Sequence, residues 1–221
     1  GEISRRRMLT HDIQEVTIAT ATSCFQQARA GQYAELSVTD IEQPRSYSFA
    51  RPPRLENVGE VSFFIRHVPG GEFTDWLFGA DRVGSEVTIS GPYGDFYQRQ
   101  SEGPMLCIAG GSGLAPIRAL VEDGAENGIA RDLLVLFGGR AQRDLYCLSE
   151  LAQLGRRWGG TFRLIPVLSE EPTTSDWSGA RGFVTDELSR LLGSRSSLLS
   201  AEAYICGPPP MVDTAIEVLQ I

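Results

Sequence analysis

Two glycine-rich turns have residue types that suit a phosphorylated ligand. Gly110–Pro116 has the sequence Gly-Gly-Ser-Gly-Leu-Ala-Pro, directly after the apolar run Met105–Ala109. Glycines let a backbone approach a phosphate, and the N–H groups at a helix start attract an anion. A tight strand-to-helix turn without a ligand would have the same composition. The spacing is not G-x-G-x-x-G, which argues against an ordinary Rossmann dehydrogenase.

The second turn is Cys206-Gly207-Pro208-Pro209-Pro210-Met211, after the apolar run Ala203–Cys206. Gly207 permits close backbone approach, and the polarizable thiol of Cys206 could lie against a flat ring. In open α/β sheets, ligands bind beyond the C-terminal ends of the strands, so both turns could face one crevice. A buried structural cysteine before a proline-initiated helix is the alternative.

Two further motifs lie in the N-terminal half. In a strand, Arg45 and Tyr47 share one face, and Ser46 and Ser48 the other. A guanidinium binds phosphate in bidentate fashion, an aromatic ring can stack on a flavin, and a hydroxyl can hydrogen-bond to it. Downstream, the turn Pro69–Thr74 could bind an anion at a helix start. An exposed strand face and an ordinary helix cap are the alternatives.

The elements that must position these motifs indicate two domains. Residues 1–102 predict a small antiparallel β-barrel, because short alternating runs are separated by turn signals. The predicted strands are Ile13–Thr20, Tyr33–Val38, Arg45–Phe49, Val61–Val68 and Glu86–Ser90, with one helical insert, Phe73–Phe78.

Residues 103–221 predict an α/β domain with a doubly wound parallel sheet. Apolar strand-like runs alternate there with helical spacing. The predicted strands are Met105–Ala109, Leu133–Phe137, Phe162–Leu168 and Ala203–Cys206. The predicted helices are Ala115–Glu126, Tyr146–Trp158, Val184–Leu192 and Pro210–Leu219, and Ser169–Gly182 is expected to be a surface loop.

Composition excludes several function classes. The 221 residues carry a net charge of −8, which argues against a nucleic-acid partner. No apolar run reaches the roughly 18 residues of a membrane span, so no membrane partner is expected. All 20 basic residues are arginine, which excludes lysine chemistry. The four cysteines form no C-x-x-C pair, which predicts reduced thiols in a cytoplasmic protein and no bound metal. Gly1 and the apolar end at Ile221 suggest that both ends are incomplete.

In this order and spacing, the four motifs resemble the ferredoxin–NADP⁺ reductase superfamily over nearly the whole chain. The phrases Phe64–Gly71 and Gly91-Pro92-Tyr93-Gly94 look most like the NADH-dependent reductase components of bacterial ring-hydroxylating dioxygenases and multicomponent monooxygenases. The resemblance implies hydride transfer from NAD(P)H to the N5 atom of a flavin. Single electrons would then pass to an iron–sulfur centre.

The resemblance also implies residue roles in both domains. Arg45 would hold a flavin phosphate, Tyr47 would lie against the isoalloxazine, and Ser48 would hydrogen-bond near N5 as a catalytic residue. Cys206 would be the catalytic residue beside the nicotinamide. The other implied flavin contacts are Ser46, Ile65, Arg66, Val68, Gly71, Phe73 and Thr74. The other implied dinucleotide contacts are Gly111, Ser112, Gly113, Gly138, Gly139, Arg140, Asp144, Gly207 and Pro208.

Cofactors and partners follow from the same resemblance. FAD is favoured over FMN because Gly71–Thr74 suits a pyrophosphate. NADH is favoured, although Arg140, Arg143 and Arg181 could meet the 2′-phosphate of NADPH or be plain surface arginines. Such reductases usually carry a plant-type [2Fe–2S] domain and a final strand. These are expected outside this chain, with a terminal oxygenase or hydroxylase as a further partner.

Other interpretations stay open. One is a free flavin reductase or a cytochrome b5 reductase-like enzyme, and another is a non-enzymatic dinucleotide-binding subunit. His11 and His67 have no motif around them and are expected to be structural or exposed.

Overall fold

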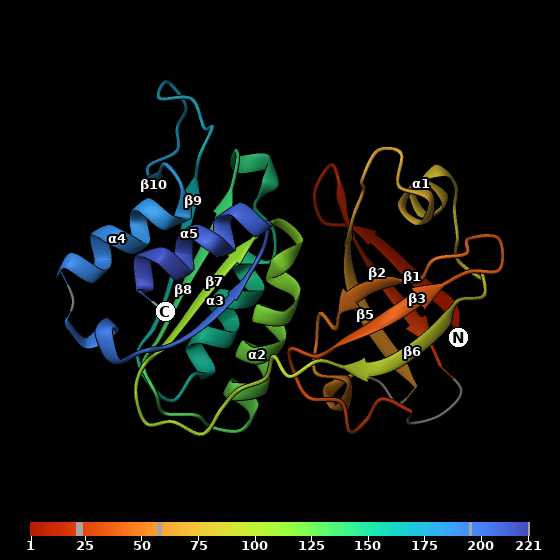
Figure 1. The fold of residues 1–221 in the computed structure, drawn as a ribbon, viewed down its shortest axis with the longest axis horizontal. Coiled ribbons are helices and arrows are strands. Elements are labelled where there is room, and N and C mark those ends of the chain that lie inside the picture. The colour runs from red at the N-terminus through yellow and green to blue at the C-terminus, as the bar shows by residue number, and fades with distance from the viewer. Residues whose placement is uncertain (21–23, 57–58, 195, 221) are drawn as a thin grey trace. The chain divides into compact units, whose positions relative to one another are not determined.

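The chain forms two compact units. The computed structural model describes residues 1–20, 24–56, 59–194 and 196–220, so the apolar end at Ile221 lies outside the described residues. Unit 1 contains Gly1–Gln98 together with Arg118–Asp123. Unit 2 contains Arg99–Ile117 together with Gly124–Ile221 (Figure 1).

Unit 1 is an antiparallel β-barrel, as the sequence predicts. One sheet has the order β1-β2-β5 and the other β4-β3-β6. Isolated antiparallel bridges join Phe49 to Phe63 and Glu2 to Glu86, and these two bridges close the sheets into a barrel. The strands are β1 (Glu2–Met8), β2 (Ile13–Ala19), β3 (Tyr33–Ser37), β4 (Arg45–Ser48), β5 (Glu60–Arg66) and β6 (Thr88–Tyr93).

The first strand of the barrel is absent from the sequence-based expectation. β1 has the sequence EISRRRM, and only Ile3 is buried, so neither alternation nor an apolar run marks it. A register shift between Ile3 and Arg5 further breaks the period of two. Pairing with β2 forms the strand, and Arg7 supports that pairing through an ion pair to Glu15 at 3.0 Å. Strand β1 therefore forms because it pairs with β2, and its local sequence does not predict it.

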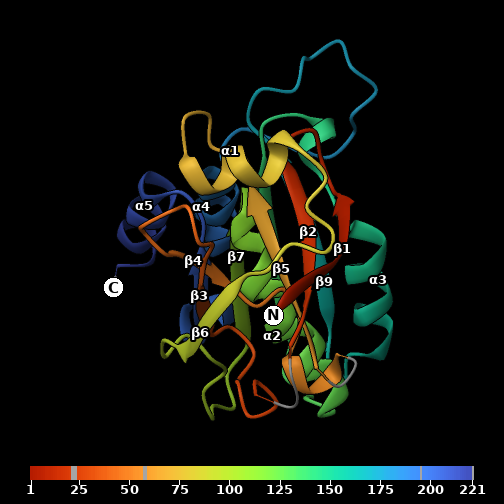
Figure 2. The same ribbon diagram turned by 90° about the vertical axis from the view of Figure 1, so that its right-hand side faces the viewer.

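Aromatic side chains fill the barrel. The ring of Phe49 lies 5.3 Å from that of Phe63 and 5.6 Å from that of Phe25. Helix α1 (Glu72–Gly79) lies at one end of the barrel (Figure 1 and Figure 2), and it buries Phe73 and Leu77 in the same core. Burial of these two apolar side chains holds α1 against the barrel that carries the N-terminal motifs.

Unit 2 is a doubly wound α/β domain, as predicted. Its five-stranded sheet is parallel throughout, with the order β10-β9-β8-β7-β11. The strands are β7 (Met105–Gly110), β8 (Leu133–Gly139), β9 (Phe162–Leu168), β10 (Ala180–Arg181) and β11 (Glu202–Cys206). The helices are α2 (Leu114–Glu126), α3 (Leu148–Arg157), α4 (Val184–Ser194) and α5 (Pro209–Leu219).

Alternate residues of the central strands pack on opposite faces of this sheet. Leu106 and Ile108 of β7 share one core cluster with Leu188 of α4 and Ala215 of α5. Every residue of β7 is buried, which is typical of a parallel strand with both faces covered. The centre of the sheet is therefore a rigid base for the turns that follow β7 and β11.

A short additional strand and a later helix start in unit 2 differ from the sequence-based expectation. The stretch Ser169–Gly182, expected to be a loop, contains the two-residue strand β10, which pairs in parallel with Val167 and Leu168. A strand of two residues leaves no periodic signal. Helix α3 begins at Leu148, two residues later than predicted, because Cys147 has the left-handed φ of 55°.

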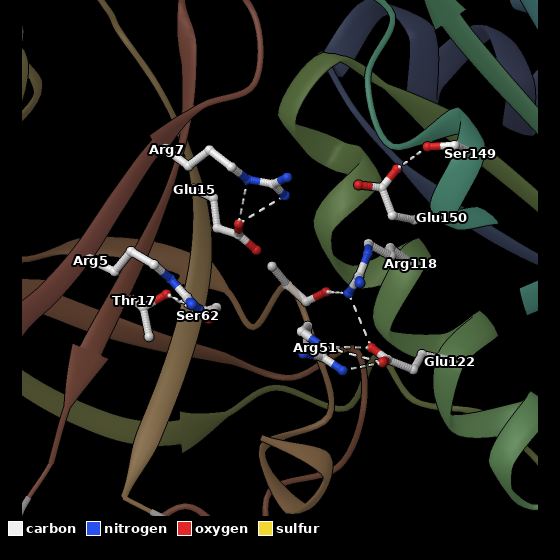
Figure 3. Close-up of polar contacts among 11 residues, drawn as sticks. Arg5, Arg7, Glu15, Thr17, Arg51, Ser62, Arg118, Glu122, Ser149 and Glu150 are labelled. Carbon is white, nitrogen blue, oxygen red and sulfur yellow. Dashed lines mark hydrogen bonds and ion pairs between the residues drawn. The ribbon is translucent and has the colours of Figure 1, made fainter. Parts of the chain in front are cut away.

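The part of α2 that belongs to unit 1, Arg118–Asp123, takes part in an ion network within that unit. Arg51 donates to both carboxylate oxygens of Glu122, with N···O distances of 2.5–3.2 Å (Figure 3). Arg118 donates from Nη1 to Glu122 Oε2 and to the carbonyl oxygen of Ala50, both at 3.0 Å. Arg118 and Glu122 are buried. The network holds the chain two residues beyond Ser48, the last residue of β4.

Candidate functional site

The structure brings the β4 motif of unit 1 to the start of α1. The rings of Tyr47 and Phe73 lie 5.7 Å apart at a tilt of 36°. Tyr47 pairs with Ala34 and Arg45 with Leu36, so the two motif side chains share one face of β4. Burial raises the pKa of Tyr47 to about 12, although the charge of Arg45 opposes this. Tyr47 is therefore a neutral phenol whose ring is available for stacking.

Arg45 keeps hydrogen-bond donors for a ligand. Its Nη1 donates to the carbonyl oxygens of Gln43 and Pro44 at 3.2 Å, and to Gln43 Oε1 at 3.3 Å. Among the described residues, the structure gives no hydrogen-bond partner to its Nε or Nη2. A guanidinium has five N–H donors, so Arg45 can bind an anion while it stays anchored to its own turn.

The turn before α1 already uses some of the donors that the sequence suggests for a ligand. Thr74 is buried, and its Oγ1 contacts Val68 N at 3.1 Å, Val68 O at 3.0 Å and Gly71 O at 3.2 Å. The amide of Gly71 donates to Val68 O at 2.8 Å. Thr74 and Gly71 thus shape the turn. The N–H groups of the first turn of α1 are left without a helical partner; they belong to Glu72, Phe73 and Thr74.

The residues of β5 contribute unequally. The side chain of Ile65 is fully buried in the barrel, so only its backbone can meet a ligand. Arg66 donates from Nε to Asp12 Oδ2 at 2.8 Å. Burial acts to raise the pKa of Asp12, but hydrogen bonds from Thr10 and Arg66 outweigh it and hold that pKa below its ordinary value. Asp12 is a partner of Arg66 that no sequence motif indicates.

In unit 2, the two glycine-rich turns lie in direct contact. A Cβ at Gly113 would stand 2.2 Å from the carbonyl oxygen of Cys206, and one at Gly207 would stand 3.1 Å from the amide of Gly110. The turns follow the neighbouring parallel strands β7 and β11, and β7 lies between β11 and β8, the next strand in the sequence. Ligands of open α/β sheets bind at such a switch point.

Tyr146 supports the first of these turns, and sequence reasoning missed it. Its hydroxyl donates to the carbonyl oxygen of Gly111 at 2.9 Å, and its ring packs edge-on against Phe137 at 5.5 Å. Gly111 has a φ of 54°, in the left-handed region that favours glycine. Because Tyr146 lies 35 residues from Gly111, no local signal could have identified it.

Cys206 is half-buried at the end of β11, where burial raises the pKa of its thiol. The thiol is therefore neutral at physiological pH rather than a thiolate nucleophile. A neutral sulfur can lie against a ring without introducing charge. Gly207 and Pro208 follow it in the turn, and a Cβ at Gly110 would stand 3.0 Å from Pro208 Cδ.

The end of β8, which is parallel to β7, lies at the same C-terminal edge of the sheet as the two glycine-rich turns. Asp144 accepts from the amides of Arg140 at 3.1 Å and Ala141 at 2.8 Å, so it caps the turn that follows Gly138 and Gly139. The side chain of Arg140 is exposed. Asp144 therefore fixes the backbone at this position.

The loop after β9 is tied to the same turn. Gln142 donates to Glu171 from its amide at 2.9 Å and from Nε2 at 2.8 Å. These hydrogen bonds lower the pKa of Glu171 and keep it ionised. Arg181 donates from Nη1 to the carbonyl oxygens of Glu171 and Pro172, and from Nη2 to Trp177 O at 2.8 Å and Ser175 Oγ at 3.3 Å. The guanidinium of Arg181 is thus engaged within its own loop.

Two general properties of the described residues complete the site. No group of three or more His, Cys, Asp and Glu residues within them could hold a metal ion. None of the described helices is long and apolar enough to cross a membrane.

Comparison with known proteins assigns a family to both units. A model of the oxidoreductase FAD-binding domain matches residues 1–97, and a model of the oxidoreductase NAD-binding domain matches residues 107–217. The crystal structure of the cytochrome P450 reductase GcoB from Amycolatopsis has a TM-score of 0.85 and 31% identity to this chain. That likeness covers 99% of this chain and 64% of GcoB.

Two curated relatives are electron-transfer proteins. The chain is 46% identical over 213 residues to the xylene/toluene monooxygenase electron transfer component XylA of Pseudomonas putida, covering 96% of this chain and 59% of XylA. It is 38% identical over 193 residues to the propane 2-monooxygenase reductase component of Mycolicibacterium goodii, covering 85% of this chain and 53% of the relative. The chain thus spans a little over half the length of these relatives.

Proposed function

Because the chain belongs to the ferredoxin–NADP⁺ reductase superfamily of FAD- and NAD-binding oxidoreductases, we propose that it passes electrons from NADH through FAD to a [2Fe–2S] centre. The [2Fe–2S] centre, on a plant-type ferredoxin domain or protein, would supply a terminal oxygenase or hydroxylase. The relatives named as electron-transfer and reductase components of monooxygenases support this proposal. Residues 1–102 would be the flavin domain and residues 103–221 the dinucleotide domain.

The residues of unit 1 fit a flavin dinucleotide. Arg45 retains free guanidinium donors for a phosphate, and α1 adds the N–H groups of its first turn beside Phe73. Tyr47 contacts Phe73, so its ring lies at the start of the same helix and can stack on the isoalloxazine. Ser48, the last residue of β4, would hydrogen-bond near N5. The remaining flavin contacts would come from Ser46, Ile65, Arg66, Val68, Gly71 and Thr74.

The residues of unit 2 fit a nicotinamide dinucleotide. The Gly111–Gly113 turn and the Cys206 turn lie in direct contact, and glycine backbones, which have no Cβ, would be able to approach a ligand closely. Cys206, Gly207 and Pro208 would line the nicotinamide with a neutral thiol. Ser112 would lie with the glycines at the pyrophosphate. Gly138, Gly139, Arg140 and Asp144 would lie at the adenosine half.

The nicotinamide and the flavin supply the redox chemistry when bound: the first donates a hydride, and the second releases electrons one at a time. The chain's own task is to orient the two rings. The neutral states of the Tyr47 phenol and the Cys206 thiol suit ring contacts of this kind, because neither introduces a charge beside the reacting atoms.

NADH is the preferred donor in this proposal. Arg181 is one of the arginines that could meet a 2′-phosphate. Both of its terminal nitrogens donate hydrogen bonds to acceptors in its own loop. The ionised carboxylate of Glu171 lies on that loop and would repel a phosphate. Arg181→Met should therefore leave the affinities for NADH and NADPH nearly unchanged. A selective loss of NADPH binding in this variant would show that Arg181 reads the 2′-phosphate.

A cytoplasmic location is part of the same proposal, because four widely spaced cysteines without a C-x-x-C pair suit a reducing compartment.

The contact between the two turns of unit 2, Gly113 against Cys206, is the observation that carries the proposal, because it brings both glycine-rich turns together at the C-terminal ends of β7 and β11, where open α/β sheets bind ligands. The test uses the chain reconstituted with FAD, NADH without oxygen, and a purified plant-type [2Fe–2S] ferredoxin. We expect NADH to reduce the ferredoxin only when the chain is present. Reduction of the flavin without reduction of the ferredoxin would instead indicate a free flavin reductase.

A further inference from the structure

The turn before α1 is held by a carboxylate that no motif identifies. Asp75 uses both of its carboxylate oxygens: Oδ2 accepts from the amide of Gly70 at 3.0 Å, and Oδ1 lies 2.8 Å from Nε2 of His67. The amide of Asp75 also donates to Gly71 O at 2.7 Å. One helical residue therefore fixes the turn at two points, and Gly70 has the left-handed φ of 79° that this shape requires.

His67 is itself held firmly. Its amide donates to the carbonyl oxygen of Asp12 at 2.7 Å, and its ring stacks on Phe78 with 4.9 Å between centroids and 22° between planes. Phe78 lies at the far end of α1. His67 thus links the end of β5 to both ends of the helix. This pairing gives a definite partner to a histidine that the sequence marks only as structural or exposed.

We propose that Asp75 and His67 are positioning residues for the phosphate end of the flavin; the proposal rests on the proposed function. Neither residue touches the flavin. Asp75 ties the Gly70 amide so that the chain enters α1 in one conformation. The N–H groups of Glu72 and Phe73 then point in a fixed direction. A turn that is already ordered does not have to be ordered when the ligand binds, which improves affinity.

His67 has a second effect on the same site. A bare carboxylate in the first turns of α1 would repel a diphosphate. Both oxygens of Asp75 face N–H donors instead, from Gly70 and His67, which reduces that repulsion. Removing His67 should therefore weaken flavin binding even though Asp75 remains.

The experiment measures the FAD dissociation constant of the flavin-free chain by titration followed by flavin fluorescence. Asp75→Ala should raise it roughly tenfold, because a partly exposed charge-assisted hydrogen bond is lost. Asp75→Asn keeps an oxygen for the Gly70 amide and should stay within about threefold of wild type. His67→Phe keeps the stacking on Phe78 but leaves one Asp75 oxygen without a donor, and should weaken binding by about threefold.

The matched control is Asp81→Asn. Asp81 lies just beyond the end of α1, its side chain is 84% exposed, and its ion pair with Arg6 is 3.6 Å long. This variant should bind FAD as wild type does, and NADH affinity should be unchanged in all variants. The melting temperature of the flavin-free His67→Phe chain should match that of wild type. Weaker FAD binding by His67→Phe would then show a positioning effect on the site, even if Asp75→Ala also lowers the stability of the chain.

Two results would overturn the proposal in distinguishable ways. Wild-type affinity for FAD in both Asp75→Ala and His67→Phe would refute the positioning role while leaving the proposed function intact. A wild-type chain that binds no FAD would remove the proposed function itself.

Discussion

The ion network centred on Glu122 allows a stability prediction with a worked magnitude. In Glu122→Gln the side chain keeps its size but loses its charge. Arg118, a residue only 9% exposed, then keeps its hydrogen bond to the carbonyl oxygen of Ala50 but loses its carboxylate partner. Arg51 loses the bidentate acceptor that it contacts at 2.5–3.2 Å. Two cations are left close together with no counter-charge from Glu122.

Removing one partner of a fully buried ion pair costs about 3–5 kcal/mol. The side chain of Arg51 is one-third exposed, at 33%, so water compensates part of its loss. We therefore expect the lower end, about 3 kcal/mol in the free energy of unfolding. For a chain of this size, that corresponds to a fall of roughly 6–12 °C in the melting temperature.

The assay is thermal unfolding of the chain followed by far-ultraviolet circular dichroism. Glu126→Gln is the control on the same helix, because Glu126 pairs with Arg157 where both side chains are about half exposed, at 45% and 58%. An exposed pair contributes less than about 1 kcal/mol, so the control should hardly shift. Equal shifts of the melting temperature in the two variants would refute the argument that burial makes the Glu122 network more stabilising than an exposed ion pair.

Three further predictions concern the candidate sites. Gly113→Ala would place a Cβ 2.2 Å from the carbonyl oxygen of Cys206, and the forced movement should weaken NADH binding by roughly tenfold or more in an equilibrium titration. Gly193→Ala, with nothing within 4 Å, should leave NADH binding unchanged. Cys206→Ala should slow anaerobic flavin reduction by NADH but leave FAD content unchanged, and an unaltered rate would remove the thiol from the site. Burial raises the pKa of Tyr47 from 10.0 to about 12, so the unfolded chain loses this proton first and stability should fall as pH rises through that interval. The fall in melting temperature should be smaller in Tyr47→Phe, and an identical pH profile would contradict the assignment.

The sequence predicted the features that local patterns encode. Most strands of both units are short alternating or apolar runs, and both fold classes are confirmed. The two glycine-rich turns of unit 2 were expected at C-terminal strand ends where both could face one crevice, and the structure brings Gly113 against Cys206. Turn signals from glycine and proline are local, so they can be recognised without tertiary information.

The features that the sequence could not predict depend on contacts between distant residues. Strand β1 is polar and exists through its pairing with β2. Arg51 meets Glu122 across 71 positions. The engagement of Arg181 by its own loop requires coordinates as well, since each acceptor is an ordinary carbonyl or hydroxyl oxygen. Residue type alone therefore left open whether Arg181 is available for a ligand.

The most direct test of the central claim is a visible absorption spectrum of the chain reconstituted with FAD, recorded before and after NADH is added without oxygen. The account predicts that FAD stays bound through gel filtration and that its absorbance bleaches on addition of NADH. Arg45→Ala serves as the matched variant and should retain less FAD, because it removes the guanidinium whose Nε and Nη2 lack partners among the described residues. A chain that takes up no FAD, or one that binds FAD and is bleached by neither NADH nor NADPH, would contradict the account.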